Sequence, residues 1–159
     1  MIFYTDGSCI NNGKANAKGG YGVVGVNDEG KVQFVRAKSE TGTTNNRQEL
    51  KAILYVMLNY GIKYDESGQP PIVYSDSAYS INTLTNWMFG WARNGWVKSD
   101  GKEPENLDLI QTYYNLLNVG YKIDLRKVPG HSGILGNELA DKLATGKITE
   151  SEVYNKYGK

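Results

Sequence analysis

The chain has 159 residues and a formal net charge of +1, from eighteen Lys and Arg against seventeen Asp and Glu. This length predicts one domain with its own core, and the near-neutral balance excludes a strongly basic tail or an acidic solvating protein. At first sight that balance also argues against a nucleic-acid partner, because phosphates favour basic surfaces.

Compartment and membrane association are constrained by what the sequence contains. No apolar stretch is long enough to cross a bilayer, so we expect no membrane partner. The only cysteine, Cys9, excludes an internal disulfide and favours a reducing compartment. Because no secretory signal is visible at the N-terminus, we expect a cytoplasmic protein.

Hydrophobic patterns with two periods divide the chain into strands and helices. They predict strands over 2–6, 20–27, 31–38, 72–75 and 121–128, and helices over 45–60, 77–87, 105–119 and 137–145. Thr43 and Thr44 are candidate N-caps of the first helix and Gly61 is its stop signal, whereas 88–104 is expected to be irregular. The order predicts an α/β fold with a five-stranded mixed sheet. Its first three strands are antiparallel, its other two are reached by crossovers, and helices cover both faces.

Four acidic residues occupy comparable positions on different elements. Asp6 and Asp76 each end an apolar strand, Glu49 lies on the inward face of the first long helix, and Asp141 lies on the last predicted helix. Ligands of open α/β sheets gather at the carboxyl ends of strands. Grouped carboxylates suit hard divalent cations, whereas a single His and a single Cys argue against zinc.

Each acid taken alone has a simpler interpretation. An acid after a strand is often a cap for the helix that follows, and Asp76 stands directly before Ser77 and Ala78. His131 lies in a loop with three glycines and is the only side chain whose ordinary pKa is near neutrality. That suits proton transfer, but a solvated loop histidine with no role is an equal alternative.

Four sequence blocks together point to a known family. They are Tyr-Thr-Asp-Gly-Ser-Cys, Thr-Asn-Asn-Arg-Gln-Glu-Leu, Tyr-Ser-Asp-Ser and Pro-Gly-His-Ser-Gly-Ile-Leu-Gly-Asn-Glu-Leu-Ala-Asp. In order and spacing they resemble type 1 ribonuclease H. The resemblance implies a ribonuclease H-like fold with a helical handle, a catalytic domain over 1–146, and a tail over 147–159 that we expect to be a short surface helix. It also implies an endonuclease that cleaves the RNA strand of RNA–DNA hybrids with two Mg²⁺ or Mn²⁺ ions, leaving 5′-phosphate and 3′-hydroxyl ends.

The same resemblance implies roles for individual residues. The metal-binding and catalytic carboxylates are Asp6, Glu49, Asp76 and Asp141, with His131 assisting proton transfer or product departure and Glu138 beside the site. The RNA strand is contacted by Asn12, Asn45 and Asn46, and the DNA strand and its phosphate by Thr44, Trp87, Trp91, Ser99 and Asn106.

Simpler interpretations stay open for several of these residues. The three asparagines suit ordinary loop and cap chemistry, Glu138 suits an ordinary surface position, and the handle tryptophans suit a local aromatic core. We assign Trp96 to packing. The handle has few net positive charges, which predicts weak hybrid binding by this segment.

The leading hypothesis is a stand-alone, monomeric, metal-dependent ribonuclease. Three alternatives remain: a module that binds hybrids without cutting, a domain from a reverse transcriptase, and a related nuclease that cuts duplex DNA. Assigning four acids to metal leaves eighteen basic against thirteen acidic residues, so the near-neutral charge no longer argues against nucleic acid.

Overall fold

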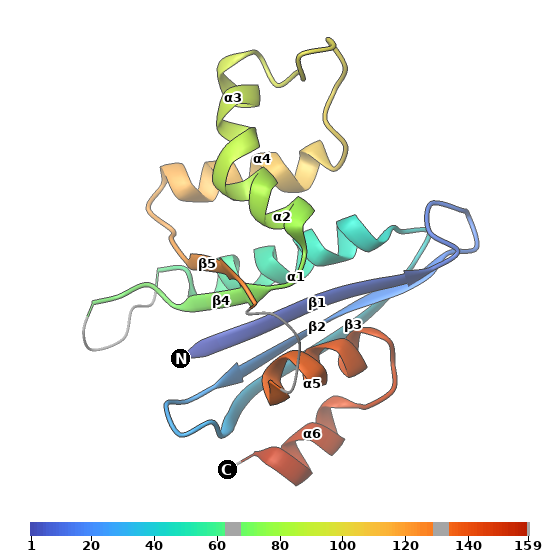
Figure 1. Ribbon diagram of the computed structural model, residues 1–159, viewed down its shortest axis with the longest axis vertical. Helices are drawn as coiled ribbons and strands as arrows, with labels where there is room; N and C mark the ends of the chain where they lie inside the picture. The colour runs from blue at the N-terminus through green and yellow to red at the C-terminus, as the bar shows by residue number, and fades with distance from the viewer. Residues whose placement is uncertain (63–67, 129–133, 159) are drawn as a thin grey trace.

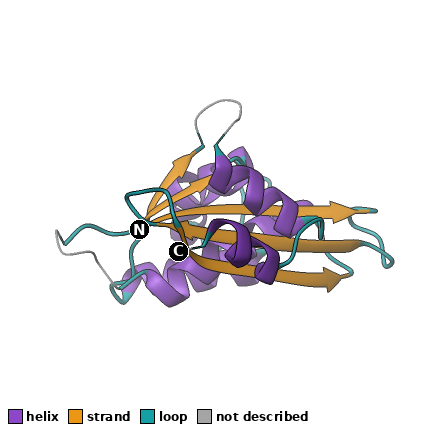
Figure 2. Ribbon diagram, turned by 90° about the horizontal axis from the view of Figure 1, so that it is seen from below, coloured by secondary structure: helices purple, strands orange, loops and turns teal. Residues whose placement is uncertain are grey.

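A five-stranded sheet with the strand order β3-β2-β1-β4-β5 runs through the molecule (Figure 1). The computed structural model describes residues 1–62, 68–128 and 134–158. The strands are β1 (Ile2–Ile10), β2 (Lys18–Val26), β3 (Val32–Thr41), β4 (Ile72–Ser75) and β5 (Asp124–Lys127). The three long strands pair antiparallel and lie side by side (Figure 2), whereas β4 and β5 join in parallel. This confirms the mixed sheet expected from the sequence.

Helices cover both faces of this sheet. They are α1 (Asn45–Tyr60), α2 (Ala78–Asn82), the π-helical turn η1 (Thr83–Trp87), α3 (Met88–Arg93), α4 (Leu107–Asn118), α5 (Leu135–Ala144) and α6 (Glu150–Tyr157). Two hydrophobic clusters result: Phe3, Ile53 and Ile110 lie in the cluster under α1 and α4. Val24 and Leu139 lie in the cluster under α5 and α6. Within the described residues, no helix combines the length and apolar character that a bilayer crossing requires.

Local capping signals explain where α1 begins and ends. The Thr44 hydroxyl accepts a hydrogen bond of 3.1 Å from the Arg47 N–H, and the Gly61 N–H closes the last turn on the Met57 carbonyl. A side-chain acceptor satisfies one of the amide groups left unpaired at a helix start. The predicted bounds of this helix are therefore correct.

The first strand is longer than expected, because β1 continues past Asp6. Its antiparallel pairing with β2 continues to the pair Ile10 and Lys18. The partner strand therefore supplies hydrogen bonds beyond Asp6 and Gly7, where the sequence predicts that the strand ends. The parallel pairing with β4 has its last partners at Tyr4 and Tyr74. The prediction that Asp6 ends the strand is wrong, but Asp6 does lie just beyond the last of these parallel pairs.

The segment 88–104 was expected to be irregular, and this is wrong for its first part. The helical backbone continues from α2 through η1 into α3, and only residues 94–104 form turns and irregular structure. Met88 is fully buried in the first hydrophobic cluster, which stabilises a helix that the Gly- and Asn-rich sequence alone does not favour. The expected helical handle is therefore present.

Two glycines let helices approach the sheet closely. A Cβ atom on Gly7 would collide with the backbone of α1 at Gln48 and Glu49. A Cβ atom on Gly22, which pairs with Asp6 across the sheet, would collide with the Ala140 carbonyl of α5. Any larger residue at either position would move a helix away from β1 or β2.

We predict that Gly22→Ala destabilises the protein, because the added methyl group must displace α5 from the sheet. Overpacking of this kind costs about 1–3 kcal/mol, and urea unfolding measures it. Gly90→Ala is the matched control, because Gly90 is helical and its Cβ would have only the Arg93 Nη2 atom nearby, at 3.9 Å. We expect the control to leave the free energy of unfolding unchanged or slightly raised, and equal losses in both variants would contradict the prediction.

Candidate active site

Three carboxylates from three elements converge at the centre of the sheet. Asp6 comes from β1, Glu49 from the first turns of α1, and Asp76 directly follows β4. One ligand oxygen from each lies within 4.8 Å of those from the other two. The structure thus brings together three of the four acids that the sequence selects.

Strand pairing places Asp6 beside Asp76. Ile2 pairs with Ile72 and Tyr4 with Tyr74, and the same register carried forward sets the two acids side by side. Ser77, not Asp76, caps α2, because the Ser77 hydroxyl accepts from the Ser80 N–H at 3.0 Å. The interpretation of Asp76 as a helix cap is therefore wrong, and its exposed carboxylate faces the cluster.

One oxygen of the Glu49 carboxylate, Oε1, is buried without a hydrogen-bonding partner among the described residues. Asp6 is only 7% exposed, and its Oδ1 accepts from the Gly7 N–H at 2.9 Å. A buried carboxylate oxygen without a donor is unfavourable unless a cation binds it.

The fourth acid, Asp141, lies on α5, which packs against β1 and β2 from the opposite face to α1. Its side chain is close enough to Asp6 to form a hydrogen bond with it, and it contributes electrostatically to both Asp6 and Glu49. Asp141 therefore lies beside the other three acids. Glu138 lies one turn before Asp141 on α5 and is exposed.

The handle, residues 86–99, carries a groove of its own. The groove has a volume of about 510 Å³ and is lined by Trp87, Trp91 and Ser99 together with Arg93 and Lys98. The two tryptophan rings lie 6.3 Å apart, and Trp87 is 44% exposed. The predicted handle residues therefore share one accessible surface.

Trp96 belongs to the interior of the handle. Its ring packs edge-on against Tyr114 at 5.2 Å between centroids. The assignment of Trp96 to packing is confirmed.

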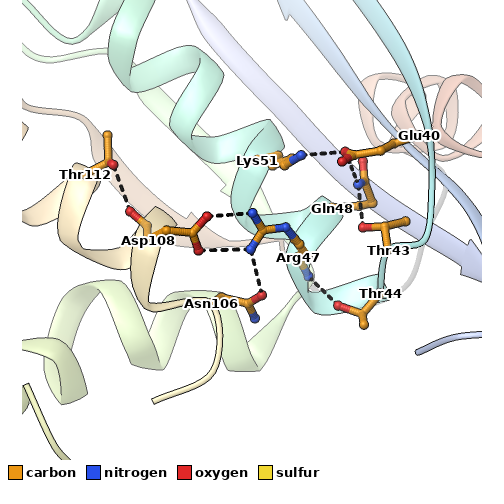
Figure 3. A network of polar contacts seen from close by, with 9 residues as sticks. All are labelled: Glu40, Thr43, Thr44, Arg47, Gln48, Lys51, Asn106, Asp108 and Thr112. Carbon is orange, nitrogen blue, oxygen red and sulfur yellow. Dashed lines mark hydrogen bonds and ion pairs between the residues drawn. The ribbon is translucent and has the colours of Figure 1, made fainter. Parts of the chain in front are cut away.

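A polar network joins the start of α1 to the start of α4 (Figure 3). Arg47 binds Asp108 through two hydrogen bonds of 3.0 and 2.6 Å and donates to the Asn106 Oδ1 at 3.4 Å. The Asn106 amide nitrogen donates to the Tyr79 hydroxyl at 3.2 Å. Asn106 and the N-cap Thr44 are thus held beside the same first turn of α1.

The three asparagines of the predicted RNA contact lie close to this helix start. The Asn12 Oδ1 accepts from the Asn45 N–H at 2.7 Å, so Asn12 adds to the cap of α1 and joins the loop after β1 to it. Asn45 and Asn46 are exposed. Their surfaces are available to a ligand, as is the amide nitrogen of Asn12. His131 lies outside the described residues.

Comparison with known proteins decides the family. The family model described as RNase H matches residues 1–149. The chain belongs to the RNase H family.

Individual RNase H relatives cover this chain to different extents. A mouse protein named Ribonuclease H1 is 35% identical over 152 residues, which make up 96% of this chain and 51% of the mouse protein. The chain thus spans about half the length of that curated relative. A Ribonuclease H of Syntrophomonas wolfei is 39% identical over 149 residues, 93% of this chain and 95% of its own.

A solved structure supports the fold of this RNase H family member. The crystal structure of LC9-RNase H1, described as a type 1 RNase H with the type 2 active-site motif, is 31% identical, with a TM-score of 0.71. The match covers 91% of this chain and 70% of that one. The resemblance and the fold class are both confirmed.

Some structural residues of this RNase H site were missed at the level of sequence. Arg47 and Tyr79 form hydrogen bonds with Asn106, and Asp108 holds Arg47 in place, although none of the three was selected. Arg47 could have been noticed, because it stands between the N-cap Thr44 and the acid Glu49. No local signal identifies Tyr79 or Asp108, because their partners are distant in the sequence.

Electrostatics separate Asp6 and Glu49 from the ordinary surface acids of this RNase H family member. Burial, followed by the negative charge of Asp76 and the contact with Asp141, raises the pKa of Asp6 to about 8. Burial, followed by the charges of Asp6 and Asp76, raises the pKa of Glu49 to about 9, and the Gly7 N–H opposes both shifts. Each pKa rises because the ionised form lacks a compensating positive charge.

The donor set fits a divalent metal ion. The RNase H family is divalent-metal dependent, and this site offers clustered carboxylate oxygens, one of them buried without a partner among the described residues. Hard divalent cations prefer such oxygen ligands, and their positive charge would stabilise the ionised form of each acid.

We predict that the metal-free protein loses stability as the pH rises from about 4 to about 9. In that window the unfolded chain has released the protons of Asp6 and Glu49 while the folded protein still binds them, so folding is favoured at the lower pH. The fall in the free energy of unfolding should be at least about 1.4 kcal/mol, which corresponds to one pKa unit. Urea unfolding in the presence of a chelator measures it.

Glu49→Gln provides the control for this pH dependence. The neutral amide removes one titrating group, so we expect a flatter pH profile for the metal-free variant. Mg²⁺ should stabilise the unaltered protein more at high pH, because its ligands must be deprotonated. Stability that stays constant or rises across the window would contradict this account.

Proposed function

We propose that this protein is a metal-dependent endonuclease that hydrolyses the RNA strand of RNA–DNA hybrids. The observation that carries the proposal is the convergence of Asp6, Glu49 and Asp76, with Asp141 beside them, in a chain of the RNase H family. The reaction would be an in-line displacement at phosphorus that leaves a 5′-phosphate and a 3′-hydroxyl. The same four carboxylates would hold two Mg²⁺ or Mn²⁺ ions.

Bound divalent ions would supply an activated water and stabilise the leaving oxygen. The protein's own contribution is to hold the ligand oxygens in place before the metal arrives. Asp6 and Glu49 are fixed by a strand and a helix start that touch at Gly7, so little rearrangement is needed on binding. Preorganised charge of this kind is among the largest contributions to catalysis.

Recognition of RNA would rest on the asparagines at the start of α1. Only RNA carries a 2′-hydroxyl, so contacts to this group distinguish the strand that is cut. Asn46 and Asn45 lie three and four residues before Glu49, and both are exposed. The side-chain carbonyl of Asn12 accepts a hydrogen bond from the Asn45 N–H. The Asn12 amide nitrogen therefore remains as the donor for a ribose hydroxyl.

The DNA strand would be held by two other surfaces. Trp87 and Trp91 offer an apolar wall for deoxyribose, with Ser99 lining the same groove. Thr44 and Asn106 would grip a DNA phosphate away from the cut. Because Arg47 occupies the Asn106 carbonyl, the amide of Asn106 is oriented as a donor, which suits a phosphate oxygen.

Two further residues complete the proposed machinery. We propose that His131 assists proton transfer or product departure, since a histidine changes protonation near neutral pH. Glu138, one helical turn from Asp141, would add a nearby carboxylate that influences the metal site.

We predict that Asp76→Asn abolishes cleavage, because the amide keeps the shape of the side chain but removes a negative metal ligand. The loss in kcat should be at least about 10²-fold, as for other preorganised electrostatic groups. The assay uses a labelled RNA–DNA hybrid with Mg²⁺ or Mn²⁺ and follows the RNA strand.

An all-DNA duplex of the same sequence serves as the substrate control and should survive intact. Equal activity in the Asp76→Asn variant would refute the proposed metal site. Tight hybrid binding by the unaltered protein without cleavage at any metal concentration would instead identify a binding module.

A separate prediction concerns the handle. Trp91→Ala should raise KM for the hybrid about fivefold or more with little change in kcat, because aromatic contacts to a nucleotide are worth about 1–3 kcal/mol. Steady-state kinetics measure the two constants. Trp96→Phe is the matched control, since Trp96 packs on Tyr114 and does not line the groove. An unchanged KM in Trp91→Ala, or an equal rise in both variants, would argue against the handle as a substrate surface.

A further inference from the structure

Asn106 has a backbone conformation that its place in the sequence does not explain. Its φ of 60° lies in the left-handed region, which residues with a side chain seldom adopt, although asparagine tolerates it better than most. Asn106 stands at the N-cap of α4, where an asparagine side chain ordinarily accepts a hydrogen bond from an amide of the first turn. Among the described residues of α4, none donates such a bond to it. The side chain is therefore directed by contacts outside its own helix.

Two residues from other helices hold this side chain. Arg47 Nη1 of α1 donates to the Asn106 Oδ1 at 3.4 Å (Figure 3), and the Asn106 Nδ2 donates to the Tyr79 hydroxyl of α2 at 3.2 Å. Asp108 fixes the guanidinium of Arg47 through two further hydrogen bonds. A strained backbone conformation persists only where the surroundings determine it, and such positions cluster at functional sites. The contacts with Arg47 and Tyr79 thus account for the conformation of Asn106.

Both contacts come from elements next to the acid cluster. Arg47 lies two residues before Glu49 on α1. Tyr79 lies three residues after Asp76, on the helix that follows β4. Asn106 is consequently tied to the acids from two sides. Side-chain hydrogen bonds, rather than neighbouring positions in the chain, fix the distance between Asn106 and the acid cluster.

We propose that Arg47 and Tyr79 are positioning residues that set how far the gripped DNA phosphate lies from the cut. They act through Asn106, whose amide keeps one N–H for a phosphate oxygen after the other is donated to Tyr79. The inference rests on the proposed function, because it concerns the substrate of that same site. Tyr79 also packs against the first hydrophobic cluster, so its ring and its hydroxyl have separable roles.

A double-mutant cycle with Tyr79→Phe and Asn106→Gly tests the proposal. Tyr79→Phe keeps the ring and removes only the hydroxyl, and glycine adopts the left-handed conformation without strain. Tyr79→Phe alone should raise KM for the hybrid at least about twofold with little change in kcat. In the Asn106→Gly background it should have no further effect, because the hydroxyl acts only through the amide. An unchanged KM, or the same rise in both backgrounds, would overturn the proposal.

Tyr114→Phe is the matched control. It removes the hydroxyl of another tyrosine that packs against the same cluster but lies outside the network around Asn106. This variant should leave KM unchanged, and a rise equal to that of Tyr79→Phe would count against the proposal.

Hybrids that carry a single uncharged methylphosphonate in the DNA strand locate the gripped phosphate. Dissociation constants measured by fluorescence anisotropy with Mg²⁺, in the Asp76→Asn background, require no cleavage. One position should weaken binding most, and Tyr79→Phe should reduce this position's penalty at least about twofold. An equal penalty with and without the hydroxyl would overturn the inference even where the unaltered protein cleaves hybrids. A protein that binds no hybrid would overturn the inference and the proposed function together.

Discussion

The repulsion among clustered carboxylates, two of them largely buried, is the constraint on which the rest of this structure depends. Asp6, Glu49 and Asp76 bring oxygens within 4.8 Å of one another, and burial and like charge together raise the pKa of the first two. Such a group would separate in a flexible chain. It persists because α1 and α5 are packed against the sheet from opposite faces, with Gly7 and Gly22 allowing the close approach.

This arrangement separates the chemistry from the recognition of substrate. The acids lie on the central strands and on the helix segments pressed against them, where backbone pairing and core packing fix their positions. The proposed grips lie farther out, on the handle groove and on the network around Arg47 and Asn106. Polar side chains with several partners hold these outer groups, so substrate contacts are oriented without adding to the electrostatic strain of the acid cluster.

The start of α1 connects these parts, because one short segment takes part in all of them. Thr44 caps the helix, Asn45 and Asn46 are exposed to a ligand, Arg47 fixes Asn106, and Glu49 joins the acids. A shift of this turn would therefore change metal binding and both proposed strand contacts together. The C-terminal α6, by contrast, acts on the far edge of the sheet, where it satisfies the amides of Val35 and Ala37.

The sequence determined whatever depends on neighbouring residues: the bounds of α1 followed from Thr44 and Gly61, and the order of strands and helices followed from periodicity. Only the folded chain decided that β1 runs past Asp6, that Ser77 rather than Asp76 caps α2, and that the handle is helical after Trp87. These outcomes depend on a partner strand, a competing hydroxyl and the burial of Met88. Likewise, the contacts of Arg47 with Asn106 and of Tyr154 with Val35 span 59 and 119 residues. Local sequence patterns carry no information about contacts between residues so far apart in the chain. The packing of helices on the two faces of the sheet brings these partners together.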